Sequence, residues 1–247
     1  MRERYCDHLK KGLLLLVVIG IAVAIGIIAV LITTESVPGV TAGVKIDGAT
    51  VKVFRPDENP YGQNYANLTA EWWKRAQQDP VPVNVLNDKT GERCQAHQDN
   101  PNVFFLYGNV GGKVERKCDV PAGKAILICV ICAEMSKAEM PGATDGELLK
   151  AAIASNTGAI LSATLNGVEI PNLQDYRVHA GPFTVCLPTN NLWGVKEGCT
   201  KEFSDGYWIF MQPLPPGDHV LHLKGSRFDP TSGQTFATET ITSLTVK

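Results

Sequence analysis

The chain has 247 residues, 44% of them hydrophobic, and a formal net charge of −2 with acidic and basic residues scattered in short alternations. No basic stripe or arm is present, which argues against a nucleic-acid partner. No internal repeat is visible. Setting aside the apolar segment described next leaves about 210 residues, enough for one decorated domain.

Residues 12–32 form an apolar run without a charge or a proline. As a helix this run is roughly 31 Å long, which matches the ~30 Å hydrocarbon core of a bilayer. The residues before it include four basic ones, Arg2, Arg4, Lys10 and Lys11. Because Lys and Arg near a membrane span stay on the cytoplasmic side, we expect the N-terminus inside and the remaining chain outside the cell membrane.

This topology divides the chain into a cytoplasmic tail (1–11), a single-pass transmembrane anchor (12–32), a stalk (33–48) and an extracytoplasmic domain (49–247). A cleaved signal peptide is the alternative. Its apolar core is ordinarily about 7–15 residues long and is followed closely by the cleavage site. Here the run is longer, and the nearest plausible site, Val40-Thr41-Ala42, lies well beyond it.

Six of the seven cysteines follow the anchor: Cys94, Cys118, Cys129, Cys132, Cys186 and Cys199. In an oxidising compartment an even number of thiols predicts disulfides, although six cysteines admit fifteen complete pairings. Asn67-Leu68-Thr69 is an N-glycosylation sequon and makes Asn67 a candidate acceptor.

Hydrophobic periodicity predicts many short strands and two helices in the outer segment. In chain order these are a strand at 49–54, a helix at 68–78, a hairpin of 103–108 with 113–120, a strand buried on both faces at 125–133, a helix at 145–156, a hairpin over 160–170, one or two strands at 176–188, a loop at 189–206, and strands at 207–214, 219–225 and 235–246. The pattern predicts a mainly β fold, an antiparallel β-sandwich or jelly roll with two short helices.

In the first predicted helix, Thr69 is the expected N-cap, and Leu68 is expected to pack on Trp73 as a hydrophobic staple. In the second hairpin, Asn166-Gly167 is a strong signal for a type I′ turn.

Cys129 and Cys132 invite a redox or metal interpretation, but they lie in an apolar run predicted to be extended. A redox motif belongs at a helix N-terminus. In a regular strand the two Cα atoms are ~10 Å apart and the side chains are on opposite faces. We therefore expect structural disulfides to two different partners, Cys186 and Cys199.

Other chemistry-bearing residues are dispersed. His219 and His222 are on opposite faces of a predicted strand, which argues against a shared metal. Trp72 and Trp73 are adjacent on a helix, so at most one can lie flat on a ligand. The acidic candidates for an acid/base pair are Glu71, Glu115, Glu134, Glu139 and Asp205. Spacing alone brings no two of them together, and the motifs predict no metal site and no cofactor.

Seven segments between residues 60 and 226 occur in an order that resembles an uncharacterised family of secreted or membrane-anchored prokaryotic proteins. They are YGQNYANLTAEWWKRA (61–76), NDKTGERC (87–94), VFFLYG (103–108), VERKCDVPAGKAI (114–126), NGVEIPNLQDYRV (166–178), PTNNLWG (188–194) and DGYWIFMQPLPPGDHVLHLKGS (205–226). The resemblance implies no activity. It implies a disulfide between Cys94 and Cys118. The chain departs from the family at Met135, where relatives carry cysteine, and in having Cys129 and Cys132.

The sequence favours a membrane-anchored extracytoplasmic module that acts by binding or assembly rather than catalysis, with protein partners or a second copy at the cell surface. The anchor confines such a module to the membrane and raises its effective concentration there. Trp193, Tyr61 and Tyr65 are the candidate contact residues, because they are aromatic residues in predicted loops. The alternatives are an extracytoplasmic glycan-acting hydrolase and a copper-handling protein built on Cys, Met and His.

Overall fold

One long strand, β5 (Ala125–Ser136), runs through the middle of the folded domain and is buried along almost its whole length. The computed structural model describes residues 43–46, 48–229 and 233–247. The predicted cytoplasmic tail and anchor, and most of the predicted stalk, lie outside these residues. Within the described ranges no helix is both long and apolar enough to span a bilayer.

The protein is mainly β, with two α-helices, as the sequence predicts. The strands are β1 (Gly43–Ile46), β2 (Ala49–Lys52), β3 (Val103–Phe105), β4 (Gly112–Val120), β5, β6 (Ile160–Leu165), β7 (Val168–Glu169), β8 (Arg177–Leu187), β9 (Gly198–Met211), β10 (Gly217–Asp229) and β11 (Gln234–Val246). The α-helices are α1 (Tyr65–Ala76) and α2 (Asp145–Ser155), and short 3₁₀ turns occupy Pro60–Gly62, Val81–Val83, Val85–Asn87 and Leu173–Tyr176.

The described strands form three sheets. A five-stranded sheet has the order β4-β11-β10-β6-β7, a four-stranded sheet has the order β3-β5-β9-β8, and β1 pairs with β2. Most neighbours are antiparallel, as expected, but β3 runs parallel to β5 and β4 runs parallel to β11. The purely antiparallel sandwich or jelly roll is therefore corrected to a mixed topology.

The predicted hairpin of 103–108 with 113–120 is wrong, because β3 and β4 belong to different sheets. All three residues of β3 are buried, which suits a sheet covered on both faces. In β4 buried and exposed positions alternate toward its end, which suits an outer strand with one face in solvent. The Gly111–Gly112 segment therefore connects two sheets instead of turning within one.

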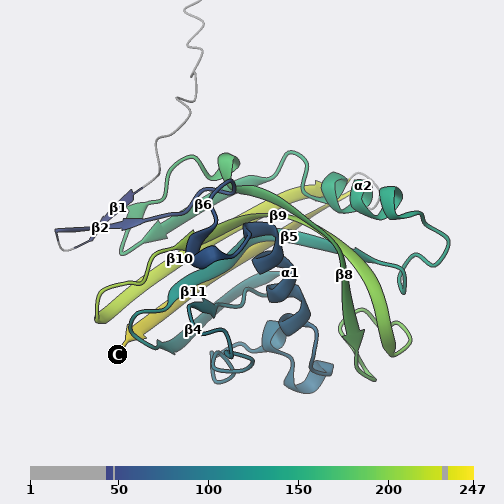
Figure 1. Ribbon diagram of the computed structural model, residues 1–247, viewed down its shortest axis with the longest axis horizontal. Helices are drawn as coiled ribbons and strands as arrows, with labels where there is room; N and C mark the ends of the chain where they lie inside the picture. Colours follow the sequence, from purple (N-terminus) through teal and green to yellow (C-terminus); the bar gives the residue numbers. More distant parts are fainter. Residues whose placement is uncertain (1–42, 47, 230–232) are drawn as a thin grey trace, which may run out of the picture. The chain divides into compact units, whose positions relative to one another are not determined.

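The four-stranded sheet separates two hydrophobic cores. One core lies between this sheet and the five-stranded sheet, where Ile126 and Ile128 of β5 belong to the same buried cluster as Leu223 and Leu244. The other lies between the opposite face and α1, where Leu127 and the α1 tryptophans pack together. Figure 1 shows α1 crossing the face of the sheet that contains β5 and β9. Strand β5 is thus buried on both faces, as predicted.

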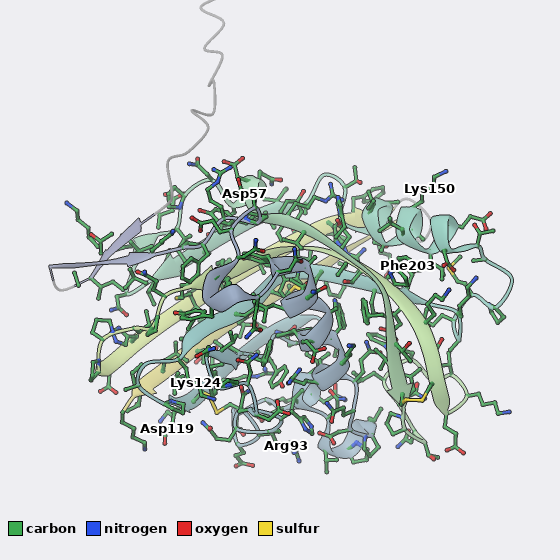
Figure 2. The ribbon with its side chains drawn as sticks, viewed as in Figure 1. Asp57, Arg93, Asp119, Lys124, Lys150 and Phe203 are labelled. Carbon is green, nitrogen blue, oxygen red and sulfur yellow. A yellow bond between two sulfur atoms is a disulfide. The ribbon has the colours of Figure 1, made fainter. Side chains whose placement is uncertain are left out.

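The helices begin at caps that the structure identifies. Helix α1 starts earlier than predicted, with Asn64 rather than Thr69 as the N-cap, and the Asn64 side chain accepts from the Asn67 backbone N–H. Thr69 lies inside the helix and donates to the Ala66 carbonyl. Helix α2 carries a capping box formed by Thr144 and Glu147. It packs against β9, the strand that contains the labelled Phe203 (Figure 2).

The turns are partly as expected. Asn166 and Gly167 have φ of 51° and 77°, which confirms the I′ turn between β6 and β7. Strand β9 begins at Gly198, so the predicted loop 189–206 is only about half that length, and residues 198–206 are strand. Side chains assumed to lie in a loop, among them Glu202, are therefore in a buried strand.

All six described cysteines are paired. Cys94 bonds Cys118, which confirms the pairing that the family resemblance implies. Cys129 bonds Cys132, and Cys186 bonds Cys199, its direct cross-strand neighbour in β8 and β9. The expectation that Cys129 and Cys132 bond to different partners is wrong.

The reason for the correction is a β-bulge between Cys129 and Ile131. The extra residue breaks the regular alternation of the strand, so that both cysteines belong to the core on the α1 side. Their Cα atoms are 6.1 Å apart, instead of the ~10 Å of a regular strand.

Candidate functional site

A cavity of about 270 Å³ lies beside the bulged half of β5. One wall comes from α1 and from the loops that cover it, and the other comes from β10 and β11. Its lining residues are Trp72, Trp73, Leu86, residues 108–110, residues 129–135, Glu139, Trp193, Leu223, Arg227, Phe236, Thr238 and Thr240. Seven consecutive residues of β5 line it, so the cavity follows the strand.

This side of β5 is open because its neighbour is short. Strand β3 pairs only with residues 125–127 of β5. The chain then leaves the sheet at Asn109, whose amide donates to the Glu239 carbonyl (3.1 Å) and to the Thr240 hydroxyl (3.2 Å) of β11. Beyond Gly108 no described strand covers this edge of β5.

The open edge presents backbone groups. Successive residues of a strand direct their N–H and C=O alternately to the two sides. The Leu127 carbonyl accepts from the Leu106 N–H (2.9 Å), so Leu127 faces the β3 side. The bulge shifts the alternation by one residue, and Cys132 and Glu134 therefore direct their backbone groups to the open edge.

The bulge is held by close packing as well as by the disulfide. Gly225 of β10 faces it from the other sheet, and a Cβ there would lie 2.7 Å from Ile131 Cβ and 2.9 Å from the Val130 carbonyl. Gly206 of β9 is equally confined, because a Cβ there would lie 2.4 Å from Cys132 Cβ. Only glycine leaves room for the bulged backbone at these two positions.

Two carboxyl groups are buried beside the cavity. Glu134 is 5% exposed and lines the cavity, and Glu202 of β9 is completely buried. Oε2 of Glu134 and Oε1 of Glu202 lack hydrogen-bond partners in the described part of the chain. Glu139, which also lines the cavity, accepts hydrogen bonds from the Ser136 hydroxyl (2.7 Å) and backbone N–H (3.1 Å).

Burial and neighbouring carboxyl groups raise the pKa values of Glu134 and Glu202. Desolvation, followed by the nearby Glu202 and Glu139 carboxyls, raises the pKa of Glu134 well above its ordinary value. Desolvation raises the pKa of Glu202 to about 8, although the hydrogen bond from Gln77 acts to lower it. Both carboxyl groups therefore keep their protons to a higher pH than an exposed glutamate does.

A hydrogen-bonded chain connects Glu202 to the loop between β8 and β9. The Gln77 amide nitrogen donates to Glu202 Oε2 (2.9 Å), and the Gln77 oxygen accepts from Trp193 Nε1 (2.7 Å). Trp193 also packs near Trp73, with ring centroids 6.4 Å apart. The indole Nε1 of Trp73 is buried without a partner among the described atoms.

The site joins one predicted contact residue with others that sequence reasoning missed. Trp193 is half-buried and lines the cavity, whereas Tyr61 and Tyr65 do not. Tyr61 is 43% exposed, but Tyr65 is fully buried in α1 and stacks edge-on against Phe210. Tyr65 is thus a core residue, and its assignment to an exposed loop is corrected because α1 starts three residues earlier than predicted. Asn67, the candidate glycosylation residue, is exposed in the first turn of α1.

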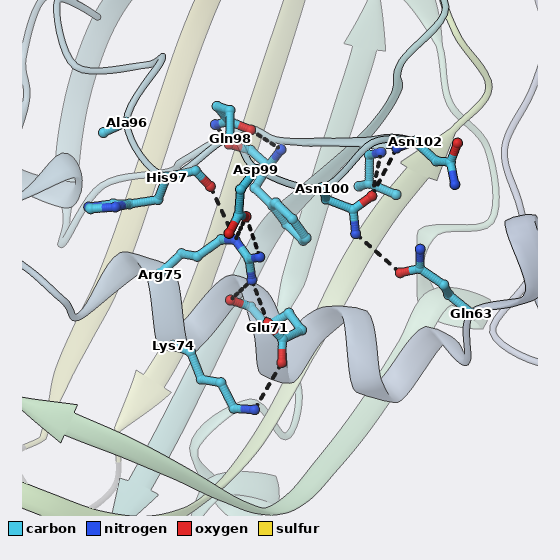
Figure 3. Close-up of polar contacts among 12 residues, drawn as sticks. Gln63, Glu71, Lys74, Arg75, Ala96, His97, Gln98, Asp99, Asn100 and Asn102 are labelled. Carbon is cyan, nitrogen blue, oxygen red and sulfur yellow. Dashed lines mark hydrogen bonds and ion pairs between the residues drawn. The ribbon is translucent and has the colours of Figure 1, made fainter.

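The other predicted acids are scattered. Glu71 binds Lys74 (2.9 Å) and Arg75 (2.5 Å) on α1, and Figure 3 shows Arg75 reaching on to Asp99. Glu115 lies exposed on β4 beside Lys113. Glu71 and Glu115 therefore do not form the facing carboxylate pair that a glycosidase needs.

Asp205 lies in a separate cluster. It is fully buried and pairs with Arg177 (3.0 Å) and His179 (2.6 Å), and it accepts from the Asn156 amide (3.0 Å). The other histidines of the described ranges have other partners: His97 contacts Asp79, His219 contacts Asn166 and Pro215, and His222 contacts Glu239. Within the described ranges no group of three or more His, Cys, Asp or Glu residues is placed to hold a metal. The six paired cysteines also offer no thiolate for copper.

These features define a β-rich domain with one sheet edge open to an aromatic and acidic cavity. No protein-family model matches the chain, and no curated protein matches it. Two solved structures are similar to parts of it. A cysteine protease inhibitor from Entamoeba histolytica, EhICP2, covers 59% of this chain and 96% of its own at 13% identity and a TM-score of 0.24. PbICP-C in complex with falcipain-2 covers 59% and 99% at 13% identity and a TM-score of 0.22. Because the identity and the TM-scores are so low, nothing about the function of this chain is inferred from these two structures.

Proposed function

We propose that this chain is an extracytoplasmic binding module, anchored in the cell membrane by residues 12–32, that binds an extended segment of a partner protein along the open edge of β5. The observation that carries the proposal is the cavity beside residues 129–135, where no other described strand completes the sheet. The ligand would add a strand next to β5.

Strand addition suits the chemistry of this edge. The backbone N–H and C=O groups of Cys132 and Glu134 supply donors and acceptors for an added strand, and the cavity accommodates its alternate side chains. The cavity is close to the lower limit of about 300 Å³ that is typical of ligand pockets. A site of this size fits one or two side chains of a segment that continues beyond it.

Hydrogen bonds hold the walls of the cavity in place in the unliganded protein. Trp72 Nε1 donates to the Leu106 carbonyl (2.8 Å), which fixes its ring against the loop that closes one end. Arg116 is 6% exposed and donates to the carbonyls of Tyr107 and Gly108 (2.8 and 2.7 Å). These hydrogen bonds hold the same loop, which follows β3, in place. A pre-organised groove loses little conformational entropy when a ligand binds.

The membrane anchor remains part of the proposal. The apolar run and the basic residues that precede it support an N-in topology. The three disulfides support an oxidising compartment for the domain. A C-terminal tag on the full-length protein should then be removed by protease added to intact cells, and a tag that survives until the cells are lysed contradicts this orientation.

The binding proposal is tested by selecting unstructured peptides against the full-length protein in detergent and measuring amide hydrogen exchange. Bound peptides should protect the backbone amides of Cys132 and Glu134. Val110 is 46% exposed at the cavity, so Val110→Trp should block binding. The matched control is Val220→Trp on β10, because Val220 is 43% exposed and does not line the cavity.

Two results contradict the proposal. Either the selected peptides protect no amide of residues 130–135, or they bind the Val110→Trp variant as well as the control. Bulges and inward-pointing charges also serve to protect sheet edges from pairing. With either result, the bulge and Glu134 would be interpreted as features that prevent another strand from pairing with this edge of β5.

A further inference from the structure

We propose that the Glu134 end of the cavity is a specificity pocket for a basic side chain, a lysine or an arginine, carried by the bound segment. This inference rests on the proposed function, because it names the chemistry of the ligand that β5 receives. It is carried by the position of a buried carboxyl, one oxygen of which has no hydrogen-bond partner among the described residues, in a cavity with aromatic walls.

The cavity leaves hydrogen-bonding capacity unused. Glu134 Oε2 and Trp73 Nε1 are both buried at the cavity, and no described residue bonds either atom. A buried polar atom without a partner costs roughly 1–3 kcal/mol, and more when the group is charged. An ammonium or guanidinium group inserted beside Glu134 would give Oε2 the donor that no described residue supplies.

The aromatic walls fit the rest of a basic side chain. Trp73 and Trp193 lie near each other on one wall, with centroids 6.4 Å apart. The methylene stem of lysine or arginine packs on apolar surface while its charged head reaches a polar group. An indole face also attracts a cation, most strongly where the cation is desolvated.

The charges around the cavity favour a cation over an anion. Glu134 and Glu139 line it, and Glu202 lies behind them on β9. Arg227 on β10 is the basic residue in the lining; it donates to the Ser155 carbonyl and lies 5.0 Å from the centroid of the Phe236 ring. An anionic ligand would be repelled by whichever of these carboxyl groups is ionised, whereas a cation would stabilise the ionised form.

Proton linkage follows from this arrangement. A cation binds the ionised form of Glu134, whereas burial and the neighbouring carboxyls raise the pKa of Glu134 in the free protein. Binding a basic side chain should therefore release a proton, and the affinity should rise as the pH rises toward that pKa. A neutral side chain in the same pocket should bind without this proton release.

The probes for the test are short alternating threonine–valine peptides whose central residue is lysine, arginine, norleucine or glutamate. Binding to the full-length protein in detergent is measured by calorimetry in two buffers of different ionisation enthalpy. The lysine and arginine peptides should bind at least about tenfold more tightly than the norleucine peptide, and they alone should release a proton. Glu134→Gln should abolish both effects, whereas Glu115→Gln, an exposed control on β4, should leave them unchanged.

The outcomes separate the two proposals. If the peptides protect the amides of Cys132 and Glu134 but the lysine and norleucine peptides bind equally, the specificity pocket is overturned and strand addition stands. If the glutamate peptide binds best, the charge argument is overturned. If no peptide protects these amides, both proposals are overturned.

Discussion

The amide of Gln77, at the C-terminal end of α1, donates a 2.9 Å hydrogen bond to the carboxyl of Glu202, in the middle of the domain. Both side chains are almost completely buried. Because the other end of the Gln77 amide holds the Trp193 indole, this single side chain ties a helix end, a strand and a loop together.

Replacing Gln77 with alanine should destabilise the protein by about 1–3 kcal/mol, because Glu202 Oε2 and Trp193 Nε1 both lose their partner. Urea unfolding measures the difference. The adjacent Gln78 is exposed, so Gln78→Ala is a matched control and should change stability little. Equal effects of the two substitutions would show that the hydrogen-bonded chain does not stabilise the fold.

Stability should fall between mildly acidic and mildly alkaline pH. Burial raises the pKa of Glu202 from an ordinary value of 4.5 to about 8 in the folded protein. The folded state therefore holds this proton more tightly than the unfolded state does. The contribution is complete below pH 4.5 and is lost as the pH rises through about 8. The loss should amount to a few kcal/mol.

Glu202→Gln keeps an acceptor for Gln77 and removes the titration, so its unfolding free energy should vary less over this pH range than that of the unsubstituted protein. Glu92→Gln, at an exposed position, serves as the control. A variant with the unchanged pH dependence would place the titrating group elsewhere. Some dependence should remain in Glu202→Gln, because the pKa of Glu134 is also raised.

Gly225→Ala should destabilise the protein by about 1–3 kcal/mol, because the added methyl group collides with Ile131 and Val130 of the facing sheet. Gly142→Ala is the control, since a Cβ at Gly142 meets nothing within 4 Å. Thermal unfolding of both variants gives the comparison. If Gly225→Ala unfolds at the same temperature as Gly142→Ala, the bulged segment of β5 can shift to make room for the methyl group at little cost.

Peptide mapping without reduction should recover one peptide that contains both Cys129 and Cys132 and is lighter than its reduced form by two hydrogen atoms. Separate linked peptides should contain Cys94 with Cys118 and Cys186 with Cys199. A link from Cys129 or Cys132 to Cys186 or Cys199 would contradict the bulged geometry of β5.

The sequence predicts the positions of most strands well, because the local periodicity of hydrophobic residues indicates which side chains are buried. The apolar run in β5 and the Asn166-Gly167 turn are examples of signals that lie within a few residues. The pairing of β3 with β5 and of β4 with β11 depends on contacts between distant segments. Local patterns contain no information about such pairings.

The site was harder to predict for the same reason. Glu134 directly follows the apolar run, and an acid inside a buried strand is a signal that sequence reasoning could have used. Glu202 escapes prediction because the sequence pattern favours a loop over residues 189–206, whereas the structure has a strand from Gly198. The bulge that brings Cys129 and Cys132 together adds one residue to β5 relative to β9. No local sequence pattern predicts this extra residue.

Strand β5 has a further consequence for how the domain unfolds. Its two faces are shared between the core under α1 and the core between the sheets, so neither can melt while the other persists. We expect a single cooperative thermal transition, with helix and sheet signals lost at one temperature.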